Sequence, residues 1–181
     1  MHRIFFIIGA SGAGKTAAIR ELKKSKLPRL KIFYFDRIGV PSSEEMTRLW
    51  GSGEAWQRAM TNRWVEKMRE ELRRADIILD GQTRPSFIVE ACRRHNIDRF
   101  EIILLDCSDD IRKARLIERG HADLANEQMM DWARYLRDET QRVGGRTVNN
   151  DNLSIQETAD ALRRLFLMKP EEQRQNDQAF L

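Results

Sequence analysis

Short, unbroken runs of hydrophobic residues alternate with longer amphipathic segments along this chain. The runs are rich in β-branched and aromatic side chains and occupy residues 4–8, 32–35, 77–79 and 102–105. Continuous hydrophobicity is typical of a parallel strand that is covered on both faces. A weaker run at 146–148 predicts a fifth strand. The pattern therefore predicts a parallel sheet.

Hydrophobic residues at helical spacing fill the gaps between these strands, at residues 17–24, 56–72, 87–94 and 111–118. A last helix begins at the capping box Ser154-Ile155-Gln156-Glu157, in which side chains and backbone N–H groups bond reciprocally. Strands that alternate with helices predict an α/β sandwich with right-handed crossovers.

The chain length of 181 residues suits one domain and hardly allows two. We therefore expect a single domain at residues 1–168, followed by a polar, loosely ordered tail at 169–181. Two stretches are long for simple connections: residues 41–74 hold two helices broken near 51–53, and residues 120–143 are polar. Long insertions of this kind usually lie at the carboxyl end of the sheet, where α/β proteins bind ligands.

Composition shows little charge bias, because 32 Lys and Arg residues face 28 Asp and Glu residues, for a formal charge of +4. Both signs are interspersed, which suits a small anionic ligand better than a nucleic acid, although a nucleic-acid partner stays open. Cys92 and Cys107 cannot form a disulfide framework, and no Cys or His spacing resembles a zinc site. The run at 4–8 is too short for a signal-peptide core or a membrane span. We expect a cytoplasmic protein without a membrane partner.

Residues 9–16 match the phosphate-loop motif G-x-x-x-x-G-K-[ST] in full, between the first predicted strand and the first predicted helix. Glycines let the backbone curl so that successive N–H groups point into one concavity, and the helix N-terminus adds partial positive charge. Lys15 is expected to bridge the β- and γ-phosphates, and the Thr16 hydroxyl to ligate Mg²⁺. A glycine-rich turn that binds nothing is the alternative. The motif in this context predicts a nucleoside triphosphate site formed by Gly9, Ala10, Ser11, Gly12, Ala13, Gly14, Lys15 and Thr16.

Three further segments resemble parts of nucleoside monophosphate kinases. Asp80-Gly81-Gln82-Thr83-Arg84 follows the third predicted strand and resembles the Asp-Gly-Phe-Pro-Arg segment of adenylate kinases. Residues 110–120 resemble the arginine-bearing helix that leads into the lid of those kinases, and residues 147–150 resemble the loop at the edge of the adenine ring. With the phosphate loop, the chain resembles the P-loop superfamily of nucleotide and small-molecule kinases. The resemblance implies a three-layer fold with a five-stranded parallel sheet in the order 2-3-1-4-5, helices on both faces and a lid insertion.

The resemblance also implies roles for single side chains. Asp80 is expected to hold Mg²⁺-bound water, and Arg84 to contact the transferred phosphoryl group, whose oxygens suit a planar guanidinium. Arg115 and Arg119 lie on one helix face and are expected to stack on the nucleobase or to clamp phosphates. Asn149 is expected beside the base. Simpler alternatives stay open: a helix cap for Asp80, solvated side chains for the arginines and a turn residue for Asn149.

Asp36 closes the second predicted strand and bears on the type of reaction. A carboxylate that accepts a hydroxyl proton aids phosphoryl transfer to an alcohol, whereas transfer to an existing phosphate needs none. Chloramphenicol, shikimate and gluconate kinases have an aspartate at a comparable place, and adenylate kinases do not use one. We therefore expect Asp36 to be the base or the anchor of the acceptor. An ion pair with Arg37, a helix cap and support of the metal stay open.

The first insertion contains three of the four tryptophans. Trp56, Met60, Trp64 and Met68 recur every four residues and so share one helical face, a pattern that is more often core than ligand site. Trp50, beside the predicted break between the two helices, is the better candidate for a substrate contact, since a flexible break suits a closing flap.

Together these features predict an ATP-dependent, Mg²⁺-requiring kinase that transfers a γ-phosphoryl group to a small-molecule acceptor, with a hydroxyl as the favoured acceptor group. Lys15, Arg84 and Arg119 would spread the charge of the moving group, and Asp36 would orient the acceptor. The first insertion would bind the acceptor, and residues 120–143 would form a mobile lid. Two alternatives stay open: a nucleoside monophosphate kinase, and a regulatory ATPase that binds a nucleoside triphosphate and phosphorylates nothing.

Overall fold

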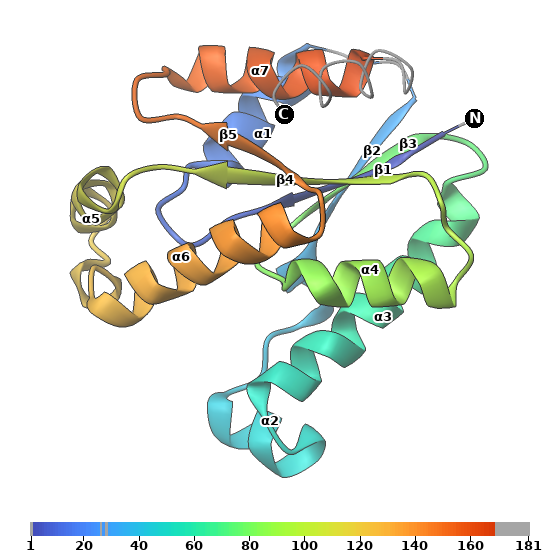
Figure 1. The fold of residues 1–181 in the computed structure, drawn as a ribbon, viewed down its shortest axis with the longest axis horizontal. Helices are drawn as coiled ribbons and strands as arrows, with labels where there is room; N and C mark the ends of the chain where they lie inside the picture. Colours follow the sequence, from blue (N-terminus) through green and yellow to red (C-terminus); the bar gives the residue numbers. More distant parts are fainter. Residues whose placement is uncertain (1, 26, 28, 169–181) are drawn as a thin grey trace.

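The computed structural model describes residues 2–25, 27 and 29–168 (Figure 1), so the predicted tail at 169–181 lies outside the described residues. Five strands form one parallel sheet in the order β2-β3-β1-β4-β5, as expected. The strands are β1 (Ile4–Ile8), β2 (Leu30–Tyr34), β3 (Asp76–Asp80), β4 (Phe100–Asp106) and β5 (Arg146–Asn149).

Seven α-helices and two short 3-10 helices connect the strands in the described part of the chain. The α-helices are α1 (Lys15–Lys24), α2 (Ser43–Trp50), α3 (Gly53–Glu71), α4 (Pro85–Arg94), α5 (Asp109–Glu118), α6 (Glu127–Arg142) and α7 (Ile155–Leu167). The 3-10 helices are η1 (Phe35–Ile38) and η2 (Ala122–Leu124). Within the described residues, none of these helices is long and apolar enough to cross a bilayer.

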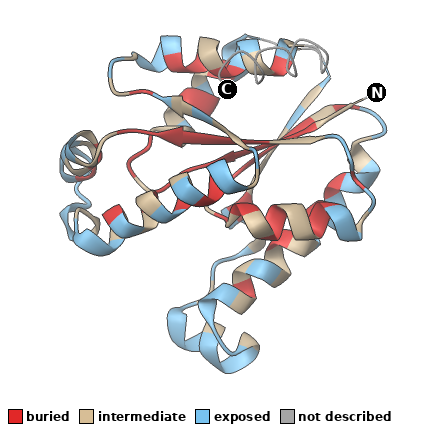
Figure 2. Cartoon of the chain, viewed as in Figure 1, coloured by how far each residue is buried: buried red, intermediate tan, exposed pale blue. Residues whose placement is uncertain are grey.

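Both faces of the sheet are covered by helices, which explains the unbroken hydrophobicity of the strands (Figures 1 and 2). Successive side chains of a strand point to opposite faces. Ile4 and Phe6 of β1 belong to a core with α3, α4 and α6, whereas Phe5 and Ile7 belong to a second core with α1 and α7. The result is a three-layer α/β sandwich.

The first insertion forms α2 and α3, and the chain turns between them at Gly51 and Ser52. Gly51 has the positive φ of 85° that ends α2, and the Ser52 hydroxyl accepts a hydrogen bond from the backbone N–H of Ala55 to begin α3. No residue of α2 is buried (Figure 2).

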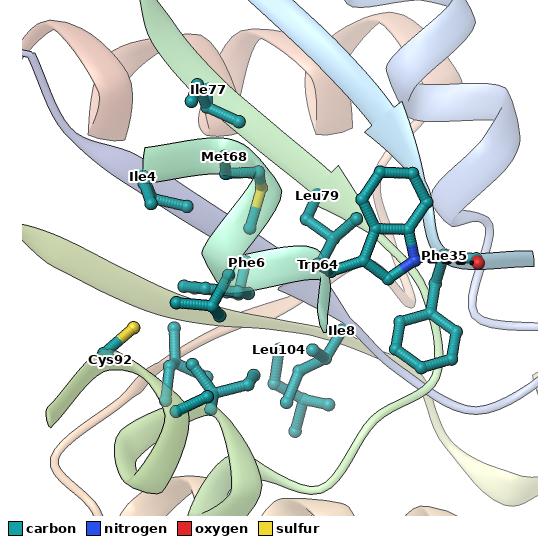
Figure 3. Packing of buried hydrophobic residues seen from close by; sticks show 14 of the residues in the cluster. Ile4, Phe6, Ile8, Phe35, Trp64, Met68, Ile77, Leu79, Cys92 and Leu104 are labelled. Atoms are coloured by element: carbon teal, nitrogen blue, oxygen red, sulfur yellow. Dashed lines mark hydrogen bonds between the residues drawn. The ribbon is translucent and has the colours of Figure 1, made fainter. Parts of the chain in front are cut away.

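The aromatic stripe of α3 packs into the core. Trp56, Trp64 and Met68 are buried, and Met60 is partly buried against the same cluster. Figure 3 shows Trp64 beside Phe35. The stripe is therefore structural, and α2 is the part of the insertion that extends away from the sheet (Figure 1).

The expected lid at residues 120–143 falls into two parts. Residues 120–126, which include η2, are mostly exposed. The rest is α6, which packs on the sheet through the buried side chains of Met130, Ala133 and Leu136. The stretch looks polar in sequence because the other faces of this 16-residue helix are charged and only a narrow face is apolar. Residues 120–126 are therefore the part of this stretch in which we expect a movable lid.

Shortening Leu136 to alanine is expected to lower the free energy of unfolding by about 2–5 kcal/mol, because the fully buried side chain would leave a cavity under the sheet. Asp138→Ala, on the exposed side of the same helix, is expected to change it by less than about 0.5 kcal/mol. Urea unfolding of both variants measures the difference. Equal, small effects would mean that α6 is not part of the core.

Candidate active site

The phosphate loop lines a cleft of about 310 Å³ at the carboxyl ends of the strands. This is the edge at which α/β sheets bind ligands. The lining includes residues 11–16 of the loop, Asp36 after β2, Asp80 at the end of β3, and Arg119 and Leu124 beyond α5. The fold therefore brings together residues that are more than a hundred positions apart.

Two glycines of the loop are required by close contacts. A Cβ at Gly9 would lie 2.4 Å from the carbonyl oxygen of Leu105, so β4 allows no side chain there. Gly12 has a φ of +82°, which favours glycine, and a Cβ there would lie 2.9 Å from Cγ of Arg112. The loop thus lies tightly on β4 and α5 and leads into the N-terminus of α1, whose first N–H groups lack intrahelical partners.

A buried arginine contacts the phosphate loop and holds it in place. Arg112 is fully buried on α5, donates to the carbonyl oxygen of Ser11 at 3.1 Å and pairs with Asp106 at 2.6 Å. Asp106 also pairs with Arg137 of α6 at 2.7 Å. The sequence prediction did not include Arg112, although it lies in the same helix as Arg115, three residues before it. A charged residue on the inward face of that helix was the available signal.

Lys15 is folded back onto the loop. Its Nζ donates to the carbonyl oxygens of Gly9 at 2.6 Å and Ala10 at 3.3 Å. Desolvation lowers the pKa of Lys15 to about 8, although the negative charge of Asp80 acts in the opposite direction. A bound anion beside Nζ would favour the charged form, so this lysine suits a phosphate partner.

Asp80 has the properties expected of a residue near a metal. Its Oδ1 is buried and has no hydrogen-bond partner among the described residues. Burial and the nearby Asp36 together raise the pKa of Asp80 to about 6, against the lowering effect of Lys15. The exposed Thr16 lies in the lining of the same cleft.

These two residues fit Mg²⁺, which binds carboxylate and hydroxyl oxygens and keeps several ligands from phosphate and water. Across residues 2–25, 27 and 29–168, no group of three His, Cys, Asp or Glu side chains gathers to hold a metal.

Asp36 is held at the rim of the cleft by its neighbours in η1. The indole Nε1 of Trp64 donates to the Phe35 carbonyl oxygen at 3.1 Å, and Gly81 packs so closely that a Cβ would lie 2.3 Å from Cβ of Phe35. Asp36 itself is exposed, and in the described part of the chain its carboxylate forms no ion pair with Arg37. The core thus fixes the backbone of η1 and leaves this carboxylate available.

Arg84 lies elsewhere than expected. Its Nη1 donates to Oε1 of Gln57 at 2.8 Å, and its Nη2 lies 3.6 Å from Glu54. The guanidinium also lies over Trp132 and lines a second cavity of about 550 Å³ rather than the phosphate cleft. Arg84 is the N-cap of α4, and its hydrogen bonds to α3 direct it to this cavity. In the structure its contacts are therefore with the insertion and α6.

Gln82 connects the phosphate loop to both neighbouring helices. Its Nε2 donates to Oγ of Ser11 at 2.9 Å, and its Oε1 accepts from Nε1 of Trp132 in α6 at 3.0 Å. Its carbonyl oxygen accepts from Nε2 of Gln57 in α3 at 3.0 Å. No local pattern marks Gln82 in the sequence, because its partners come from three distant segments.

A third cavity of about 180 Å³ lies beside Gly14 and is lined by Arg115, Arg119 and Asn150. Nη1 of Arg115 donates to Oδ1 of Asn150 at 3.0 Å, and Nδ2 of Asn150 donates to the carbonyl oxygen of Ala13 at 3.0 Å. Asn149 is exposed and accepts instead from the backbone N–H of Asp151. The buried Asn150, rather than Asn149, is thus the asparagine that contacts the phosphate loop.

Comparison with known proteins relates this geometry to a fold. No protein-family model matches the sequence, and no curated protein matches it. Among solved structures, the shikimate kinase of Acinetobacter baumannii in complex with shikimate has a TM-score of 0.63 and 17% identity, over 92% of this chain and 94% of that one. The tunicamycin resistance protein of Deinococcus radiodurans has a TM-score of 0.63 and 17% identity, over 93% and 98%. A sugar kinase from Janibacter sp. has a TM-score of 0.58 and 15% identity, over 94% and 98%.

The chain has the fold of the P-loop small-molecule kinases. The similarity extends over more than nine-tenths of each chain. At 15–17% identity the comparison shows the fold alone.

Hydrogen exchange is expected to slow at residues 119–126 when a non-hydrolysable ATP analogue binds, because Arg119 and Leu124 line the phosphate cleft from this exposed segment. The buried side of α6 is expected to be protected in both states. Mass-spectrometric exchange with and without the analogue measures this. If exchange at 119–126 is slow both with and without the analogue, the segment is a fixed element. If the analogue slows exchange throughout α6 as well, the lid includes all of residues 120–143.

Proposed function

We propose that this protein is an ATP-dependent, Mg²⁺-requiring kinase that transfers the γ-phosphoryl group to a hydroxyl group of a small molecule. The observation that carries the proposal is the position of Asp36. Its carboxylate lies in the same cleft as Lys15 and Asp80 without an ion-pair partner in the described part of the chain. A free carboxylate beside a phosphate loop is suited to accept the proton of an alcohol.

Each side chain of the cleft has its own role in the proposed reaction. The loop N–H groups and Lys15 bind the phosphates, and Lys15 and Arg119 stabilise the charge on the transferred group. Thr16 would ligate Mg²⁺, and Asp80 would orient water bound to it. When bound, Mg²⁺ neutralises charge on the phosphate oxygens. Asp36 orients the acceptor hydroxyl and takes its proton.

The nucleobase would lie in the cavity beside Gly14. Arg115 provides a planar guanidinium along one wall, held by Asn150, and Ile155 provides an apolar surface. A flat base between a guanidinium and an apolar side chain gains both stacking and burial. Arg119 lines both this cavity and the phosphate cleft, which supports a role for it between the base and the phosphates.

Three observations favour a hydroxyl over a phosphate acceptor. Asp36 is anionic and would repel a second phosphate near the transfer site. Arg84, the side chain that the resemblance to adenylate kinases would assign to phosphates, contacts Gln57 and Glu54. Two of the structural neighbours are named as kinases of shikimate and of sugars, which are small molecules with hydroxyl groups.

An ATP-consumption screen tests the proposal. The panel contains nucleosides, nucleotides, sugars, antibiotics and oligonucleotides, with product mass as the second readout. A product heavier than one alcohol by one phosphoryl group is the expected result. Transfer to nucleoside monophosphates alone would favour the alternative kinase class, and ATP hydrolysis without any product would favour a regulatory ATPase.

A further inference from the structure

An aromatic cavity adjoins the phosphate cleft. Its volume is about 550 Å³, and its walls include Arg84, Leu124, Asn126, Met129, Trp132 and Tyr135; we call these six residues the aromatic cavity. Leu124 lines the phosphate cleft as well, so this side chain borders both hollows. A molecule in the aromatic cavity would therefore lie beside the cleft that Asp36 and the loop line.

The aromatic wall is rigid and partly exposed. The rings of Trp132 and Tyr135 are stacked on α6, with centroids 5.3 Å apart and planes 15° apart. The indole Nε1 of Trp132 donates to Gln82, which itself binds Ser11 of the phosphate loop. Tyr135 is 38% exposed. An exposed aromatic surface in a fixed orientation is costly in water and favours a ligand that covers it.

The charges of the cavity are already paired. Arg84 lies over the Trp132 and Tyr135 rings at 5.0 and 5.6 Å, and its guanidinium binds Gln57 and approaches Glu54. Asp131, at the rim, pairs with Arg134. A phosphate or carboxylate would therefore find no unpaired cation among the described residues of this cavity.

We propose that the aromatic cavity binds the phosphoryl acceptor, and that the acceptor is an uncharged alcohol with a flat aromatic ring. The ring covers the side of Tyr135 and Trp132 that is exposed, and the hydroxyl group points past Leu124 toward Asp36. This rests on the proposed kinase function. It adds the class of acceptor, which that function leaves open.

The transfer balances without another reactant. The acceptor oxygen forms a bond to the γ-phosphorus while the bond from that phosphorus to the β–γ bridging oxygen breaks. The bridging oxygen leaves with the electron pair as part of the nucleoside diphosphate. The hydroxyl proton passes to the Asp36 carboxylate and then to water.

Two matched probes test the class of acceptor: 1-phenyl-1,2-ethanediol and 1-cyclohexyl-1,2-ethanediol, which share their hydroxyl groups and differ in ring flatness. Saturation-transfer NMR with the full chain measures the dissociation constant of each. We expect the phenyl probe to bind about threefold to tenfold more tightly, the range of an aromatic pair beyond simple burial. Tyr135→Ser should remove this preference, because it removes a ring.

Three variants serve as controls. Tyr135→Phe retains the ring and should retain the preference, and Asp138→Ala, on the exposed side of the same helix, should leave it unchanged. Trp50→Leu tests the other aromatic candidate, on α2. Equal binding of the two probes, a preference that survives Tyr135→Ser, or one lost in Trp50→Leu alone would overturn the proposal. Thermal unfolding of each variant establishes that it is folded.

Adding ATP distinguishes this inference from the proposed function. If the phenyl probe binds as expected but neither it nor any compound of the screen is phosphorylated, the kinase function is wrong and the ligand class stands. If a non-aromatic alcohol is phosphorylated and the phenyl probe does not bind, the kinase function stands and the ligand class is wrong.

Discussion

Lys15→Ala is expected to lower kcat for phosphoryl transfer by about 10²–10³-fold while the protein remains folded. Lys15 lies at the phosphate loop, and its Nζ donates to the carbonyl oxygens of Gly9 and Ala10. The next residue, Ser11, is held separately, by Arg112 at its carbonyl oxygen and by Gln82 at its hydroxyl. Removing the amine therefore removes a positive charge from the transferred phosphoryl group and leaves the loop supported. Steady-state kinetics with the acceptor identified by the screen measures the loss.

A lysine from the other end of the same helix provides the control. Lys24→Ala removes an exposed amine that pairs with Glu21, and it should leave kcat unchanged. Circular dichroism and thermal unfolding of both variants establish that they are folded. Wild-type turnover in Lys15→Ala would mean that the phosphate loop does not bind the reacting nucleotide.

Asp36→Asn is expected to lower kcat by about 10²–10⁴-fold at saturating substrates, with little change in the affinity for ATP. Asparagine keeps the size of the side chain but cannot accept the hydroxyl proton. Asp36 belongs to η1, and its backbone is fixed through the Phe35 carbonyl by Trp64, so the substitution should not disturb the cleft. Full kinetics against both substrates separates the two effects.

A Mg²⁺ titration of the same variant distinguishes two roles of Asp36, as the base and as a residue that supports the metal. If Asp36 acts on the acceptor, the Mg²⁺ midpoint stays the same and the rate stays low. A shifted midpoint with a restored rate would assign Asp36 to the metal. Asp98→Asn, an exposed aspartate before β4 at the opposite edge of the sheet, is the matched control and should be unaffected. Normal turnover in Asp36→Asn would remove the support for a hydroxyl acceptor.

Much of the fold could be predicted from local pattern. The hydrophobic runs of the strands are unbroken because β1 and its neighbours are covered by helices on both faces. The phosphate loop was recognisable because its glycine spacing reflects backbone geometry that few other sequences satisfy. The order of the strands came from resemblance to P-loop kinases, since hydrophobic period alone does not reveal which strands are neighbours.

The polar stretch before β5 was harder to interpret from sequence. The prediction of one lid at residues 120–143 was based on the overall polarity of that stretch. In the structure, α6 buries Met130, Ala133 and Leu136 on one narrow face. A helix whose other faces are charged is polar as a whole even when it belongs to the core. Packing against the sheet therefore decides its role, and composition does not.

The α/β sandwich, the phosphate loop and the position of Asp36 after the second strand could all be predicted from sequence. They depend on short-range patterns and on the parallel sheet that aligns the ends of its strands. The directions of the polar side chains became known only from the packed structure. Arg84 meets Gln57 and Trp132, Gln82 meets Ser11, and Asn150 meets Ala13, each across a long sequence separation. Such contacts depend on how helices pack over the sheet, which no local pattern specifies.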